Sequence, residues 1–263
     1  MFHQPLNTFG TKIYNAVLYT DATFKEHFHK SYELIYCVGE RAQIEVESET
    51  IELSCGDFLL LFPYKKHAFH IQSEKNAIWV GVFSGDYVKE FDREFADREP
   101  KNAKFRVDER TEEYLKNTFL LSAPLDKYAI KGLLYLVLGE FAKQAKFRPR
   151  SVGEKRELIM QIIEYVEKNF REEITLQTLA KELGYNFQYL SRVFRQSMRM
   201  NFRALVNQYR FDHARLLLEK ENITVMQAAL DSGFQSVRNF NRLYKEKTGQ
   251  TPQRVKRDKK KSK

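Results

Sequence analysis

Cysteine is scarce in this sequence, and its scarcity excludes several ways of stabilising a fold. The 263 residues contain only Cys37 and Cys55, with no CxxC pair and no cysteine–histidine cluster of zinc-finger spacing. Two cysteines fit a reducing compartment, where we expect buried free thiols, although the two could also pair. The sequence also lacks an apolar run long enough to span a bilayer, and residues 1–12 lack the features of a secretory signal. These absences predict a cytoplasmic protein without a membrane partner.

The excess of positive over negative charge is confined to the C-terminal part of the chain. The formal net charge is +9, yet residues 155–263 alone contain 23 lysines and arginines against 12 aspartates and glutamates. The basic residues at the C-terminal end do not account for the whole excess. Such a bias indicates that this part binds a polyanion. RNA binding gains no support, because the sequence lacks the aromatic stacking motif of RRM domains.

Short segments rich in aromatic and β-branched residues indicate strands in the N-terminal half. Glycines and a proline separate these segments. We expect six strands, over residues 12–20, 31–38, 42–47, 57–62, 67–72 and 77–83. Consecutive short strands of this kind predict a small all-β barrel or sandwich.

A helix is expected over residues 125–145, after these strands. One face of it carries the apolar residues Ile130, Leu133, Leu134, Val137, Leu138 and Phe141 at helical spacing. Tyr135 and Leu136 fall outside this face, so we expect the helix to contact a second surface, either in its own domain or in another subunit. Residues 147–154 are rich in charge and contain proline and glycine, which predicts a linker.

A weak internal repeat follows the expected linker. Residues 174–185 and 223–234 each begin with Ile-Thr, carry an alanine four residues before a glycine, and place an aromatic residue after that glycine. We expect the glycines, Gly184 and Gly233, to adopt positive φ angles in turns between two helices. Each repeat therefore predicts a helix-turn-helix unit.

Capping residues mark where the helices of the two units begin. Thr175 and Thr224 are suited to cap the first helix, and Gln227 is placed to close a capping box with Thr224. Asn186 and Ser236 are suited to cap the second helix of each unit. Between the units, residues 201–220 predict one long amphipathic helix that fixes the distance between the two second helices.

The second helices have one apolar and one polar face. The apolar faces are marked by Leu190 with Phe194 and by Phe240 with Tyr244, four residues apart. The polar faces carry donors and cations that suit base edges and phosphates in a major groove. The candidate DNA-binding residues are Asn186, Gln188, Tyr189, Ser191, Arg192, Arg195, Ser236, Val237, Arg238, Asn239, Arg242 and Lys245. Two such helices about 34 Å apart would enter successive major grooves.

This arrangement resembles the AraC/XylS family of bacterial transcription regulators. The matching residues are Leu179-Ala180 through Phe194, Arg210-Phe-x-x-Ala214-x-x-Leu217-Leu218, Gly233-Phe234 through Arg242, and Thr248-Gly249-x-Thr251-Pro252. Carried over by position, the family's base-facing residues fall on Gln188, Ser191, Arg192, Val237, Arg238, Asn239 and Arg242. The resemblance implies a regulator that binds duplex DNA as a homodimer, with RNA polymerase as a further partner of an activator.

The N-terminal strands resemble the cupin-type sensor domain that often accompanies this module. The residues that carry this resemblance are His27-Phe-His29-Lys-Ser-Tyr-Glu33-Leu, Gly56-Asp57, Pro63 and His67. It implies a small barrel with a pocket for a small-molecule effector and a following helix that dimerises. The candidate effector-pocket residues are His27, His29, Glu33 and His67.

The same four residues follow the ligand order of metal-binding cupins. Three imidazoles and a carboxylate suit iron, manganese, nickel or zinc, and open positions on such an ion would support enzymatic chemistry. In a regulator, however, residues in this order form the wall of a pocket that holds no metal. We favour this interpretation from the sequence. We therefore expect no cofactor.

The sequence thus predicts a multidomain chain. Its expected parts are an all-β cupin-like barrel with following helices over 1–146, a linker over 147–154, an all-α tandem helix-turn-helix domain over 155–258, and a basic tail over 259–263. The expected function is effector-controlled transcription regulation without enzymatic activity. The alternative is a metal-dependent cupin enzyme with a helical appendage, but an enzyme has no need of a basic tandem repeat.

Overall fold

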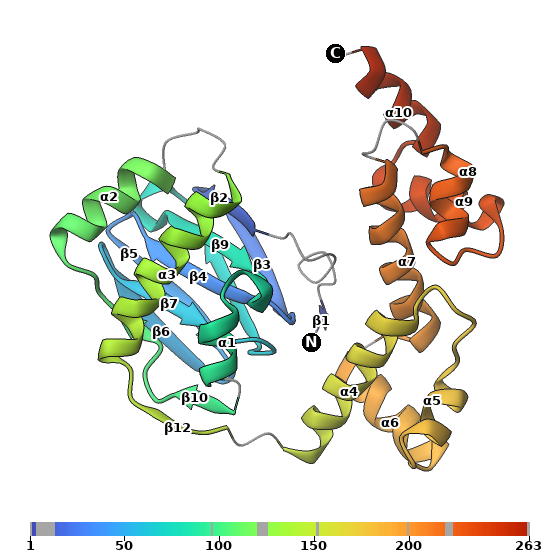
Figure 1. Cartoon of the computed structure of the whole chain (residues 1–263), viewed down its shortest axis with the longest axis horizontal. Helices are drawn as coiled ribbons and strands as arrows, with labels where there is room; N and C mark the ends of the chain where they lie inside the picture. The colour runs from blue at the N-terminus through green and yellow to red at the C-terminus, as the bar shows by residue number, and fades with distance from the viewer. Residues whose placement is uncertain are drawn as a thin grey trace. The chain divides into compact units, whose positions relative to one another are not determined.

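Figure 1 shows the chain, as a computed structural model, in two compact units, Met1–Ser151 and Val152–Lys263. The structure describes residues 2–3, 14–95, 97–119, 126–150, 153–198, 200–218 and 223–261. Within these ranges, no helix is long and apolar enough to cross a membrane. The boundary between the units falls inside the segment predicted to be a linker.

The N-terminal unit is built on two five-stranded sheets. Their strand orders are β1-β3-β8-β5-β6 and β11-β7-β4-β9-β2, and all neighbours are antiparallel except β1, which runs parallel to β3. The strands span Phe2–His3 (β1), Tyr14–Tyr19 (β2), Ala22–Phe28 (β3), Tyr32–Cys37 (β4), Arg41–Val46 (β5), Glu49–Ser54 (β6), Phe58–Leu61 (β7), His67–Ile71 (β8), Ile78–Phe83 (β9) and Lys104–Phe105 (β11). The β-rich N-terminal domain predicted from sequence is therefore confirmed.

All six predicted strands are present as β2, β4, β5, β7, β8 and β9, with ends that differ by a few residues. Residues 12 and 13 of the first prediction lie outside the described residues. The sequence pattern missed β3 and β6. β3 contains a bulge between Phe24 and His27, which interrupts the alternation of inward and outward side chains. β6 lies at a sheet edge and buries only Leu53, so it carries little apolar alternation.

An apolar core fills the space between the two sheets. It includes Ile35 and Val80 from the second sheet and Ile44, Leu53 and Phe69 from the first. All five side chains are buried, as expected for inward positions of facing sheets. The interior of this barrel is thus largely filled by side chains.

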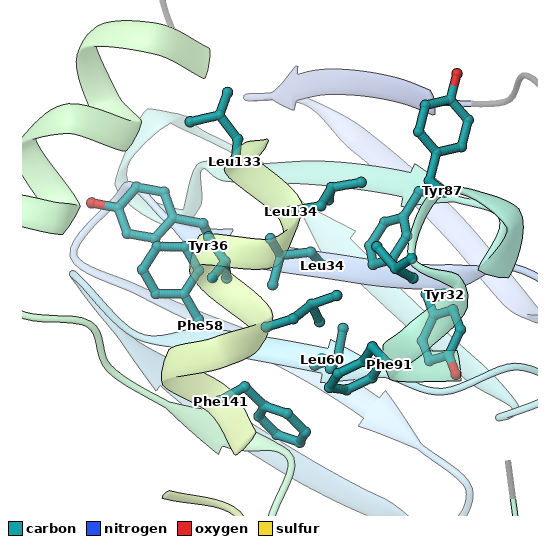
Figure 2. Close-up of a cluster of buried hydrophobic side chains, with 14 of the residues drawn as sticks. Tyr32, Leu34, Tyr36, Phe58, Leu60, Tyr87, Phe91, Leu133, Leu134 and Phe141 are labelled. Atoms are coloured by element: carbon teal, nitrogen blue, oxygen red, sulfur yellow. The ribbon is translucent and has the colours of Figure 1, made fainter. Parts of the chain in front are cut away.

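A second core lies on the outer face of the second sheet, where helix α3 (Lys127–Gln144) crosses the strands. Figure 2 shows Leu133, Leu134 and Phe141 of α3 in the same buried cluster as Leu34 and Leu60 of the sheet. The shorter helices of this unit are η2 (Glu74–Asn76), η3 (Gly85–Tyr87), α1 (Lys89–Phe95) and α2 (Glu109–Phe119). Residues of η3, α1 and α2 extend the same core.

The apolar face predicted for α3 is confirmed, because all six of its residues are buried. The two apolar residues outside that face differ from each other. Tyr135 packs against the core of its own domain, and its hydroxyl donates to Glu90 of α1. Leu136 is 38% exposed. Part of the second surface is therefore internal, and Leu136 remains on the outside of the domain.

The linker prediction is wrong for its first three residues. Phe147–Pro149 form strand β12, which pairs antiparallel with β10 (Arg98–Pro100). Glu99 of β10 fastens the pairing, because its carboxylate accepts from Arg148 at 2.7 Å and from Lys65 at 2.9 Å. A three-residue edge strand that contains proline gives no strand signal in sequence.

The C-terminal unit is all-helical, as predicted. Its helices are α4 (Glu154–Asn169), α5 (Leu176–Glu182), α6 (Phe187–Met198), α7 (Phe202–Leu218), α8 (Val225–Asp231), α9 (Val237–Thr248) and α10 (Pro252–Lys261). α5–α6 and α8–α9 are the two helix-turn-helix units, and α7 is the predicted connector. Residues 259–261 of the predicted basic tail belong to α10, while 262 and 263 lie outside the described residues.

Candidate nucleic-acid interface and buried histidine cluster

Both repeats form the same turn between their two helices. Gly184 (φ +71°) and Gly233 (φ +81°) have the left-handed conformation that the sequence predicts. The aromatic residue after each glycine, Tyr185 or Phe234, donates its N–H to the carbonyl of the repeat's alanine at 2.9 and 3.1 Å. These bonds satisfy carbonyls left free at the end of the first helix.

The first helices begin at their predicted threonines, but with different capping bonds. The Thr175 hydroxyl accepts from the N–H of Thr178, whose own hydroxyl accepts from the N–H of Thr175, which closes a capping box. Thr224 accepts from the N–H of Gln227 at 3.0 Å. The Gln227 amide donates to Asp231 instead of returning to Thr224, so the box predicted there is replaced by a bond within α8.

Asn186 and Ser236 begin α6 and α9. The Asn186 side-chain oxygen accepts from the N–H groups of Gln188 and Tyr189, and the Ser236 hydroxyl accepts from that of Asn239. Their acceptor oxygens are thus engaged by the backbone of their own helices. Among the candidate DNA-binding residues, these two have a capping role.

On the outer face of α6, two tyrosine rings stack on each other and an arginine side chain lies over one of them. The ring of Tyr189 stacks on that of Tyr185, with centroids 6.0 Å apart, and the Arg192 guanidinium lies 5.7 Å from the Tyr189 centroid. Gln188, Arg192 and Arg195 are exposed, and Ser191 is half-buried. Tyr185 was not among the residues that the sequence proposed for DNA binding. Phe234, at the same position of the second repeat, is buried, whereas Tyr185 is exposed.

The outer face of α9 is organised by charge instead of rings. Arg242 donates to Asn239 at 3.1 Å and lies 3.4 Å from Glu246. Arg238 and Lys245 are exposed on the same helix. Val237 is half-buried and packs against the core of this unit, and the base contact implied by its position stays a prediction. The two second helices therefore present unlike surfaces.

A polar network links the turn after α4 to the second helix-turn-helix unit through α7. His213 of α7 accepts from Arg171, which follows α4, at 3.0 Å. It lies 2.9 Å from the hydroxyl of Ser232, which ends α8. Ser232 in turn donates to the carbonyl of Ala228 at 2.6 Å. Because Ser232 is fully buried, this chain of bonds fixes the turn after α4 and the end of α8 to the connector. No sequence motif marks these residues, since they come from three segments that are far apart in the chain.

The N-terminal candidate residues His27, His29, Glu33 and His67, here called the histidine cluster, are brought together as predicted. All four side chains are buried, each at most 4% exposed, and their nearest ligand-type atoms lie within 4.8 Å of one another. Glu33 Oε2 lies 2.8 Å from His29 Nε2 and 3.2 Å from His67 Nε2. These buried polar groups converge on one another, and their role in an effector pocket stays a prediction.

The strands that carry the cluster explain its assembly. His27 lies on β3 and His67 on β8, where the two residues are directly paired across the first sheet. The bulge before His27 re-aims this side chain, since two consecutive exposed residues, Lys25 and Glu26, precede it. Glu33 lies on β4 of the second sheet, and His29 precedes that strand. The cluster therefore bridges the two sheets.

The charges within the cluster and the burial of its side chains shift the pKa values of Glu33 and His67 in opposite directions. Burial raises the pKa of Glu33, but the neighbouring His67 and His29 outweigh it and hold this pKa below its ordinary range. Burial lowers the pKa of His67, but the carboxylate of Glu33 reverses that effect and raises it. His27 lies farther from Glu33, and burial lowers its pKa to about 4. His27 is thus a neutral imidazole near pH 7.

Comparison with known proteins agrees with this two-domain architecture. Residues 15–136 match the AraC-like ligand binding domain, and residues 179–258 match a helix-turn-helix domain. The chain belongs to the AraC family of transcription regulators. The match to the ligand-binding domain covers the histidine cluster, and the match to the helix-turn-helix domain covers both α6 and α9.

Two relatives of this AraC-family chain illustrate the extent of similarity. An uncharacterised HTH-type transcriptional regulator of Staphylococcus aureus is 33% identical over 100 residues, which is 38% of this chain. The matched segment spans only 13% of that relative's length. The Msm operon regulatory protein of Streptococcus mutans is 20% identical over 247 residues, covering 90% of this chain and 87% of its own.

The fold also resembles a solved structure that aligns over both domains. ToxT of Vibrio cholerae, in a crystal structure with an unsaturated fatty acid bound, is 15% identical with a TM-score of 0.55. The alignment covers 93% of this chain and 94% of ToxT. This likeness supports the order and fold of the two domains.

Proposed function

We propose that the chain is a sequence-specific transcription regulator that binds duplex DNA in the cytoplasm. The observation that carries the proposal is the pair of helices α6 and α9, which expose unlike sets of cations and amides. Arg192 rests on a ring and Arg242 is held by Asn239, so both guanidiniums are positioned before DNA arrives. Preordered arginines suit guanine edges in a major groove. The membership of the AraC family and the basic C-terminal part support the same conclusion.

We propose further that a small molecule bound in the N-terminal domain controls DNA binding. A cavity of about 280 Å³ opens beside the turn between β5 and β6 and is lined by Ile51, Leu60, Phe62, Lys65 and Lys101, among others. The lining also includes the carboxylates Glu47 and Glu49, so apolar groups stand beside charges of both signs. Such a mixture suits a small amphipathic molecule. The effector would therefore occupy this cavity and not the buried histidine cluster. The unsaturated fatty acid bound to ToxT is also amphipathic.

Regulation is favoured over the alternative of a metal-dependent enzyme. An enzyme needs a cavity through which substrate reaches the reacting groups, whereas the histidine cluster is buried under its own strands. The tandem helix-turn-helix unit also has no role in such an enzyme. We therefore propose that the chain has no catalytic activity of its own.

A homodimer formed through α3 is also proposed. The outer side of α3 carries Tyr128, which is 72% exposed, and Leu136 two turns later. Gly132 and Gly139 lie on the same side, and no atom approaches within 4 Å of the position a side chain would take there. A partner helix could thus approach closely and bury both apolar side chains, as in interfaces between packed helices.

Selection from a randomised duplex library with the full chain tests DNA binding. We expect an asymmetric consensus whose two parts lie about one helical turn apart, with affinity that falls as salt rises. Arg192→Ala should relax base preference in one part and Arg242→Ala in the other, each with a loss of about 1–3 kcal/mol. Lys168→Ala removes one exposed charge from α4 and serves as the matched control. No enriched sequence, or equal losses in all three variants, would contradict the proposal.

A further inference from the structure

The positions of the protons in the histidine cluster follow from its backbone contacts. The Nδ1 atoms of His27, His29 and His67 lie 2.8, 3.1 and 2.9 Å from the carbonyl oxygens of Lys25, Ser31 and Lys65. A carbonyl oxygen only accepts, so each Nδ1 must carry the proton. In a neutral imidazole, the Nε2 atom is then left with a lone pair.

These lone pairs face the carboxylate of Glu33 in a place that water does not reach. The ligand-type atoms of all four residues lie within 4.8 Å of one another. His67 Nε2 lies within ion-pair distance of Glu33, yet it is fully buried without a hydrogen bond. His29 Nε2, by contrast, is hydrogen-bonded to the same carboxylate at 2.8 Å. A buried nitrogen such as His67 Nε2 that lacks a hydrogen-bond partner is unfavourable unless a cation satisfies it.

We propose that His27, His29, Glu33 and His67 form a binding site for one divalent first-row transition metal ion. Three imidazole nitrogens and one carboxylate oxygen are a donor set that such ions prefer. Carbonyl acceptors on the distal nitrogens are the usual partners that orient metal-bound histidines. Ligands at about 2.0–2.2 Å from an ion lie at most about 4.4 Å apart, so a shift of a few tenths of an ångström closes the cluster around it.

The competing state is a cluster held together by protons alone. His29 and His67 would each carry a second proton and donate it to Glu33. That state leaves the Nε2 atom of His27 with no donor and puts two imidazolium ions beside one carboxylate in a buried site. The metal satisfies all four groups at once, and this difference reverses the metal-free interpretation favoured from sequence.

The ion would cross-link the two sheets of the barrel. His27 and His67 come from the first sheet. Glu33 comes from the second sheet, and His29 comes from the turn before its strand. A ligand that binds only the folded state raises the free energy of unfolding. Metal binding should therefore raise the melting temperature of the N-terminal unit, a readout independent of DNA.

The test uses the full chain, freed of metal with a chelator that is then removed, and titrated with Co²⁺. We expect one equivalent of Co²⁺ to produce visible d–d absorption, displaced by Zn²⁺, and to raise the melting temperature. His27→Gln and Glu33→Gln should each weaken Co²⁺ binding at least tenfold. His70→Gln is the matched control, because His70 lies on β8 but bonds only to Thr23 and Gln72 among the described contacts. Circular dichroism checks that each variant is folded.

Two results would overturn the metal site. One is the absence of both the absorption band and the stabilisation in the folded wild-type chain, which identifies a proton-held cluster. The other is equal Co²⁺ binding in the cluster variants and the wild type, which assigns the ion to another place. Binding to the selected DNA is measured separately on the same samples, so failure of the metal site leaves the proposed regulator intact and the reverse also holds.

Discussion

The two turn glycines look equivalent in sequence but differ in their surroundings. Both have positive φ angles, which cost other residues about 1–2 kcal/mol. A Cβ on Gly184 would meet no atom within 4 Å, whereas one on Gly233 would lie 2.6 Å from the Cα and carbonyl oxygen of Arg171. The close approach of Arg171, which also binds His213, therefore requires glycine at position 233.

Gly233→Ala should destabilise the C-terminal unit more than Gly184→Ala. Gly184→Ala should lose about 1–2 kcal/mol from the left-handed conformation alone. Gly233→Ala should show a further loss of about 1–3 kcal/mol, because the backbone of Arg171 must move. Urea unfolding followed by the helical circular dichroism signal measures both losses. Equal losses in the two variants would show that the turns are equivalent after all.

Asp212 is a buried carboxylate that weakens the fold at neutral pH. Its side chain is 1% exposed, and burial raises its pKa to about 6, although Gln208, Arg215 and Lys247 act in the opposite direction. Because this pKa is higher in the folded chain, the folded state holds the proton between about pH 4 and 6 while the unfolded state has released it. The free energy of unfolding therefore falls as pH rises through this window.

Asp212→Asn should stabilise the chain at pH 7.5 but not at pH 4. The difference in pKa sets an upper limit on the order of 2–3 kcal/mol for the gain at pH 7.5. Urea unfolding of wild type and variant at both pH values measures it. Asp231→Asn, which alters an exposed carboxylate of α8, is the control and should show no such pH-dependent gain. A gain of the same size at pH 4 would contradict the assignment.

At the scale of elements, polar contacts fix α7 to the segment between α4 and α5 and to the second helix-turn-helix unit. Arg210 donates to the carbonyls of Phe170 and Glu172 at 2.6 and 2.7 Å, which holds the turn between α4 and α5. His213 connects that side to Ser232 and the second unit. We therefore expect these contacts, together with the length of the helix, to limit changes in the separation of α6 and α9.

His213→Ala should make DNA binding more tolerant of changes in half-site spacing. The wild-type chain should lose affinity when one base pair is inserted between the two parts of its selected site. The loss should shrink by about 1 kcal/mol in the variant, the usual net value of a hydrogen bond. Leu216→Ala alters an exposed residue of the same helix and is the control. Fluorescence anisotropy on the two DNA duplexes gives the comparison, and an unchanged spacing penalty would exclude this role for His213.

The sequence predicted elements where apolar periodicity was regular and missed them where it was not. The face of α3 and the caps Thr175 and Ser236 follow from local patterns, so they were predictable. β3 was not, because its bulge breaks the alternation just before His27. The residues of the histidine cluster were recognised by their order along the chain. Their convergence depends on how two sheets pack, which that order alone does not show. The carbonyl groups that accept from their Nδ1 atoms are also visible only in the structure.

At the scale of the whole molecule, we expect the exposed side of α3 to determine whether two chains associate. Leu136→Glu places a charge in the centre of the proposed interface and should convert the dimer to a monomer at micromolar concentration, because burying an unpaired charge is strongly unfavourable. Leu18→Glu is the matched control, since Leu18 is 48% exposed on β2 of the same domain. Sedimentation equilibrium measures the mass of each variant.

The dimer prediction also has a consequence for DNA. A dimer has two copies of the unequal pair α6 and α9. It should therefore bind DNA that carries two copies of the asymmetric site far more tightly than DNA that carries one, because binding of the first chain raises the effective concentration of its partner at the second site. The Leu136→Glu variant should retain affinity for a single site and lose this enhancement. If Leu136→Glu and Leu18→Glu both remain dimeric, another surface holds the two chains together, and the outer side of α3 is free of that role.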